Sequence, residues 1–132
     1  MLAQRAASLR RAGRIDEAIA AYEELLKAEP NRPDSWYNLA WLQRHARRYE
    51  QALSSYGEAL NRGVRDPQDV HLNRAVILSD HLARPEDAEA ELKAALELKP
   101  DYVPALLNLG NLHEDRGNRR PSLFVGRRQQ TL

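Results

Sequence analysis

The 132-residue chain contains no cysteine. This absence excludes disulfide bonds, zinc sites built on thiolates and cysteine nucleophiles. Aromatic residues are also few, at 6% of the chain. No apolar run approaches the roughly 18 residues that a membrane-spanning helix needs. The segment after Met1 lacks the apolar core of a signal peptide. We therefore expect a cytoplasmic protein that does not interact with a membrane.

Motifs of catalytic and cofactor sites are absent too. The sequence has no glycine-rich phosphate loop, no G-x-G-x-x-G, no H-E-x-x-H and no EF-hand loop. Histidines are present, but His71 and His81 do not share a face of the helix on which they are predicted to lie. Neighbouring acidic residues fall on predicted outer faces, where solvation is their ordinary role. We predict that the chain is not an enzyme and that it binds neither a metal nor a cofactor.

Charge is abundant but unevenly distributed. Charged residues make up 30% of the chain and the formal net charge is +1. Residues 1–115 carry 15 lysines and arginines against 19 acids, a net charge of −4, whereas residues 116–132 carry five arginines and no acid. Such a tail is compatible with a nucleic-acid contact, but no aromatic platform accompanies it and a solvated terminus is the simpler interpretation. We do not predict a nucleic-acid partner.

A repeated segment is the strongest pattern in the sequence. Ala18-Ile-Ala-Ala-Tyr22 recurs 34 residues later as Ala52-Leu-Ser-Ser-Tyr56, and after a further 36 residues as Ala88-Glu-Ala-Glu-Leu92. The preceding segments also align, because Trp36-Tyr-Asn-Leu-Ala40 is similar to Leu106-Leu-Asn-Leu-Gly110. Repetition with this period is typical of solenoids built from pairs of helices.

These segments resemble the tetratricopeptide repeat family, whose 34-residue signature reads W-x2-L-G-x2-Y, then A-x3-F, then P. The second unit matches it through Trp36, Leu39, Ala40, Gln43, Ala52 and Tyr56. The fourth unit matches its first part through Leu106, Leu109, Gly110 and His113. Gln43 and His113 stand where the signature has tyrosine. The resemblance implies an all-α, right-handed solenoid of about three and a half repeats over residues 1–118, followed by a basic tail over residues 119–132.

Apolar spacing and turn residues place the helices. Seven are predicted, over residues 1–12, 15–28, 33–46, 49–62, 67–82, 85–98 and 103–116. Gly13, Gly63 and Gly117 are predicted to follow helices as left-handed caps, and Asp66 to cap the helix that begins at Pro67. The second unit is two residues longer than the first, and we place the extra residues in a loop over 62–66.

The resemblance implies that the first helix of each repeat lines a concave groove that binds a protein or peptide. Candidate binding residues lie on these helices, on the face opposite the packing residues. They are Tyr37, Asn38, Trp41, His45, Asn73, Arg74, Ile77, His81, Asn108, Asn111 and Asp115.

Two of these predictions have a plainer alternative. Asn38, Arg74 and Asn108 stand one unit apart, and such side chains either form a ladder that holds a peptide backbone or simply cap and solvate their helices. Trp41 is either a binding anchor or a side chain packed between repeats.

The dicarboxylate clamp of chaperone-binding tetratricopeptide domains offers a second comparison. Asn38 and Arg74 fall at two of its places, but Ala3, Ala7 and Val70 occupy the others and cannot serve. We therefore do not expect binding to the acidic tails of heat-shock chaperones. The predicted function is a protein- or peptide-binding scaffold. The alternative is the repeat segment of a larger bacterial transferase, with no catalytic residue in this chain.

The last predicted helix is expected to leave Leu106, Leu109 and Leu112 uncovered, because residues 119–126 lack the pattern of a second helix. Three arrangements remain open. The apolar residues 123–125 fold back over this face, two chains pair through it, or a downstream domain covers it. We favour pairing, and hence a homo-oligomer, because three apolar side chains are too few to cover a helix face.

Overall fold

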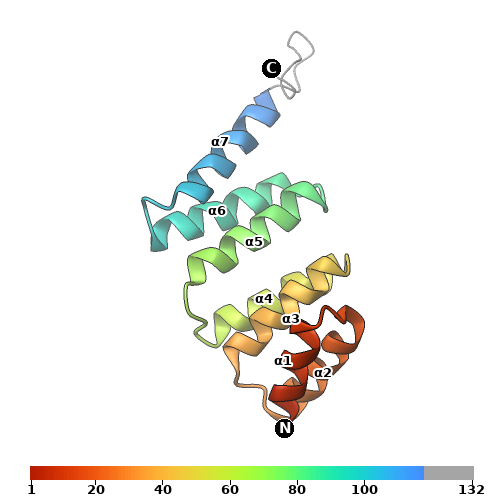
Figure 1. Cartoon of the computed structure of the whole chain (residues 1–132). Coiled ribbons are helices and arrows are strands. Elements are labelled where there is room, and N and C mark those ends of the chain that lie inside the picture. Colours follow the sequence, from red (N-terminus) through yellow and green to blue (C-terminus); the bar gives the residue numbers. More distant parts are fainter. Residues whose placement is uncertain (118–132) are drawn as a thin grey trace.

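A computed structural model describes residues 1–117, which form seven helices (Figure 1). They are α1 (Leu2–Arg11), α2 (Ile15–Ala28), α3 (Pro33–His45), α4 (Tyr49–Asn61), α5 (Pro67–Asp80), α6 (Pro85–Leu98) and α7 (Val103–Gly117). Consecutive helices pair as α1 with α2, α3 with α4 and α5 with α6, and α7 follows alone. The predicted all-α solenoid is confirmed, and each helix boundary lies within two residues of its predicted position.

Proline and glycine explain where the helices begin and end. Prolines open α3, α5 and α6, where a missing N–H is tolerated and the fixed φ suits a helix. Gly13 and Gly63 follow α1 and α4 with φ of 76° and 79°, the left-handed conformation predicted for them. Gly117, in contrast, is still helical.

The loop between the second and third repeats lies where the sequence predicted it. Residues 62–66 are outside the helices, so the longer second unit does not interrupt the solenoid. Asp66 occupies the N-cap position of α5, as predicted, but its side chain makes no capping hydrogen bond. Asp66 instead has a φ of 54°, and this left-handed turn directs the chain into α5.

Buried side chains form two hydrophobic clusters that meet at α3. The first joins α1, α2 and the Leu39 and Leu42 side of α3, and the second extends from Ala40 through α4, α5 and α6 to α7. Trp36 packs against both clusters. Several alanines of the helices are fully buried, and such small side chains allow helix backbones to approach closely. These are Ala6, Ala18, Ala40, Ala52, Ala88 and Ala105.

The final helix is packed only in part. Its start is fixed by Tyr102, which donates a hydrogen bond to Asp69 of α5, and α7 then extends away from α5 and α6 (Figure 1). Leu112 was predicted to be uncovered, but it is buried, and Leu109 is half-buried. Leu106 is exposed, as predicted. The exposed apolar side chains at this end of the molecule are Leu98, Val103, Leu106 and Leu107, and we call them the α7 patch.

The predicted tail, including the apolar residues 123–125, lies outside the described residues. Among the helices of residues 1–117, none combines the length and the apolar character required to cross a membrane.

Candidate functional site

Side chains of the first helices α1, α3, α5 and α7 line two cavities and form a hydrogen-bonded bridge, and we call the surface that they form the first-helix surface. At its N-terminal end, Arg10 of α1 and Tyr37, Asn38 and Trp41 of α3 line a cavity of about 270 Å³. The cavity thus joins the first and second repeats. Arg10, which also donates a hydrogen bond to Tyr22 at 3.1 Å, was not among the predicted residues, because the first unit carries little of the repeat signature.

Trp41 and His45 form an exposed aromatic pair beside this cavity. Their ring centroids are 3.8 Å apart, and His45 Nδ1 lies 2.9 Å from the carbonyl oxygen of Trp41. Trp41 is 37% exposed and belongs to neither hydrophobic cluster. The indole is held in place by His45 but remains accessible. This favours a binding anchor over a side chain that is packed between repeats.

A polar bridge links α3 to α5 in the middle of the surface. Arg44 donates a hydrogen bond to Asn73 Oδ1 at 3.0 Å, and Asn73 Nδ2 donates to the hydroxyl of Tyr37 at 3.5 Å. The Tyr37 ring meets the ring of Tyr56 edge-on at 5.6 Å. Burial raises the pKa of Tyr56 to about 12. The bridge fixes Tyr37 and Asn73 in place.

Two predicted residues of the third repeat face inward. Ile77 is fully buried in the larger hydrophobic cluster, so its predicted place on the surface is wrong. Arg74 is half-buried and pairs at 3.2 Å with Glu91 of α6, which also contacts His71 at 2.7 Å. The guanidinium of Arg74 is therefore turned toward the second helix of its own repeat.

His81 is exposed, but it also contacts the neighbouring repeat. Its ring stacks on Tyr49 of α4, with centroids 4.2 Å apart and an angle of 8° between the planes. The third repeat consequently offers fewer free side chains than its sequence suggested. Within residues 1–117, no group of three or more potential ligands is arranged to hold a metal ion.

A second cavity lies at the C-terminal end of the surface. It measures about 370 Å³ and joins α5 to α7 through Ser79 and Asp80 on one side and Asn108, Asn111 and Asp115 on the other. Asn108 Nδ2 donates to the carbonyl oxygen of Pro104 in its own helix at 2.7 Å. The predicted ladder is therefore uneven. Asn38 lines a cavity, while the charge of Arg74 and the amide donor of Asn108 are used within the protein.

Comparisons with known proteins agree with this architecture. The tetratricopeptide repeat family matches residues 4–78 and 82–118. Superkiller complex protein 3 of Mus musculus is 30% identical over 105 residues, which are 78% of this chain and 6% of that protein. The chain thus spans only a small part of its curated relatives.

Solved structures have the same fold. The first TPR of Spaghetti (RPAP3), bound to an HSP90 peptide, has a TM-score of 0.75 at 22% identity, over 88% of this chain and 90% of that one. A tetratricopeptide repeat protein from Parabacteroides merdae has a TM-score of 0.78 at 26% identity, over 89% and 45% of the two chains. The chain has paired helices with buried alanines, and the family matches it over most of its length. It therefore belongs to the tetratricopeptide repeat family.

Proposed function

We propose that the first-helix surface binds an extended segment of a partner protein. The observation that carries this proposal is the accessible Trp41–His45 pair beside the cavity of Arg10, Tyr37 and Asn38. Tryptophan and arginine are enriched among the residues that dominate binding energies. The side chains here are also held by contacts within the protein, which reduces the entropy that a partner must overcome.

The size of the surface suits a short peptide. Four first helices about 10 Å apart give a length of roughly 30 Å, enough for about nine extended residues. The backbone and polar side chains of the peptide would contact the polar bridge of Arg44 and Asn73. They would also contact Asn111 and Asp115, which line the C-terminal cavity.

The proposed segment is not an acidic C-terminal tail. The related domain of Spaghetti binds an HSP90 peptide. In this chain, however, Arg74 is already paired with Glu91 and Val70 is fully buried, so neither is free to hold a terminal carboxylate. The lack of a complete clamp favours an internal segment of the partner.

Selection from a displayed library of random nine-residue peptides would test this function. We expect binders whose affinity falls about 30-fold for Trp41→Ala, equivalent to the loss of a 2 kcal/mol anchor. Leu98→Ala is the matched control, because it truncates an exposed apolar side chain outside the surface and should leave affinity unchanged. Circular dichroism would confirm that both variants fold. Selected peptides that bind a folded Trp41→Ala variant as tightly as the wild type would contradict the proposal.

A further inference from the structure

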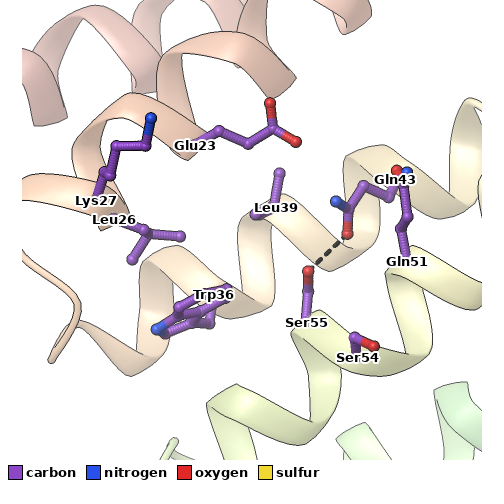
Figure 2. A pocket seen from close by; sticks show the side chains of 9 residues that line it. All are labelled: Glu23, Leu26, Lys27, Trp36, Leu39, Gln43, Gln51, Ser54 and Ser55. Atoms are coloured by element: carbon purple, nitrogen blue, oxygen red, sulfur yellow. Dashed lines mark hydrogen bonds between the residues drawn. The ribbon is translucent and has the colours of Figure 1, made fainter.

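A larger cavity, of about 450 Å³, lies on the other side of α3 (Figure 2). It is lined by Glu23, Leu26, Lys27, Trp36, Leu39, Gln43, Gln51, Ser54 and Ser55. These residues come from α2, α3 and α4, and those of α3 lie on the helix face opposite Tyr37, Asn38 and Trp41. We call this space the α2–α4 cavity. It is separate from the first-helix surface.

Contacts at both ends of α2 and α4 frame the cavity. Near the start of the two helices, Arg48 pairs with Asp16 at 3.4 Å. Beyond their ends, Arg62 donates a hydrogen bond to the carbonyl oxygen of Pro30 at 2.6 Å. Between these ties the two helices pack on α3, and the space is left open. The cavity is therefore a feature of the repeat packing rather than of a loose loop.

The cavity exists where the repeat signature has a tyrosine. Gln43 occupies that position in α3, and it is smaller than the aromatic ring that the signature would place there. Its neighbour on α4 is Ser55, which is also small. Both side chains are smaller than a tyrosine ring, and space remains between the three helices.

Gln43 presents an unused hydrogen-bond donor to this space. The residue is only 4% exposed, and its Oε1 accepts a hydrogen bond from Ser55 at 2.7 Å. Its Nε2 has no partner among residues 1–117 and points toward the cavity (Figure 2). An acceptor brought by a ligand would gain a hydrogen bond from this amide, in a space partly shielded from water.

The walls of the cavity are apolar and rigid. Leu26 and Leu39 form two of them, and the indole of Trp36 forms a third (Figure 2). Trp36 Nε1 donates to the carbonyl oxygen of Pro30 at 2.7 Å, and the guanidinium of Arg62 lies 5.6 Å from the ring centroid. These contacts hold the indole in place, as a preformed aromatic site requires.

The rim is polar and electrically balanced. Glu23 and Lys27 stand on α2, and the exposed Gln51 and Ser54 stand on α4. One acid and one lysine give no net charge, so the rim favours a neutral group in the cavity. Its side chains flank the opening on two helices, where they are able to hydrogen-bond the backbone of a chain that crosses it.

We propose that the α2–α4 cavity binds a tyrosine side chain of a partner polypeptide. The ring lies between Trp36, Leu26 and Leu39, and its hydroxyl oxygen accepts a hydrogen bond from Gln43 Nε2. The partner backbone crosses the rim between α2 and α4. A tyrosine matches both the apolar walls and the amide donor of Gln43, whereas phenylalanine matches only the walls.

Titration of the full chain, labelled with ¹⁵N, would test the site with three probes: N-acetyl-tyrosine amide, N-acetyl-phenylalanine amide and p-cresol. We expect shifts at the Trp36 indole and the Gln43 side-chain amide, with the tyrosine probe binding about fivefold more tightly than the phenylalanine probe. Binding of p-cresol should be weaker, because it has no backbone for the rim. Equal or tighter binding of p-cresol would overturn the polypeptide ligand, and the absence of shifts at these residues would overturn the site.

Three variants separate occupancy of the cavity from folding. Gln43→Tyr places the signature residue in the space, so it should fold and should weaken the tyrosine probe at least tenfold. His113→Tyr makes the same kind of change at the equivalent, exposed position of the fourth repeat and should have no effect. Gln43→Met keeps the size of the side chain but removes the donor, and should abolish the preference for tyrosine over phenylalanine. Unchanged binding to a folded Gln43→Tyr variant, or an unchanged preference in Gln43→Met, would contradict the proposal.

Discussion

The first helices of the second and fourth repeats, α3 and α7, carry the same signature but are packed differently. Ala40 in α3 is fully buried between its neighbours. Gly110 occupies the equivalent place in α7, yet a Cβ atom added there would meet nothing within 4 Å. The reason is that α3 has α2 on one side and α4 on the other, whereas α7 contacts α6 and only a small part of α5. The small residue of the signature is therefore buried only where a neighbouring helix packs against it.

The prediction with the largest expected effect compares the same leucine-to-alanine substitution in α3 and in α7. Leu42 in α3 is fully buried and Leu106 in α7 is 48% exposed. We expect Leu42→Ala to lower the free energy of unfolding by about 3–5 kcal/mol and Leu106→Ala by less than about 1 kcal/mol, because only the first leaves a cavity. Urea denaturation followed by circular dichroism would measure both. Equal losses would mean that α7 is covered in solution.

The same contrast explains how much of the fold was predictable. The repeat period, the prolines before α3, α5 and α6 and the glycines after α1 and α4 are local signals, and the helix boundaries follow from them. The loop over residues 62–66 was predictable for the same reason, because Gly63 and Pro67 bracket it. The packing of α7 was less so, since the burial of Leu112 depends on the angle at which the helix leaves α6.

The candidate site was harder to predict because its contacts join different helices. Ile77 stands one unit after Trp41, but the third repeat buries that position while the second exposes it. The pairing of Arg74 with Glu91 connects α5 to α6 and has no counterpart in the second repeat, where Ser55 occupies the place of Glu91. The sequence shows that Gln43 stands where the signature has tyrosine. The cavity beside Gln43 could not be predicted from this difference alone, because it also depends on how α2 and α4 pack on α3.

A second prediction concerns what covers α7 in solution. We propose that two chains associate through the α7 patch, because exposed apolar side chains at a solenoid end promote association. Leu107→Glu places a charge in the most exposed part of this patch and should weaken self-association about tenfold, or about 1.4 kcal/mol. Sedimentation equilibrium would measure it.

The control for this prediction is Asn31→Glu, which adds the same charge at an exposed position outside the α7 patch and should leave association unchanged. A wild-type protein that remains a monomer at high concentration would contradict pairing.

The last test exchanges the two signature residues themselves, and Gly110→Ala has a small expected effect. Gly110→Ala should raise the free energy of unfolding by about 0.5–1 kcal/mol, because alanine restricts the unfolded chain and the new methyl group meets open space. Ala40→Gly should lower it by about 1–2 kcal/mol, since it weakens the helix and also removes a buried methyl group. Both would be measured by denaturation at several protein concentrations. A destabilising Gly110→Ala whose effect grows with concentration would show that a second chain packs closely on α7, so this small substitution also tests how near a partner approaches.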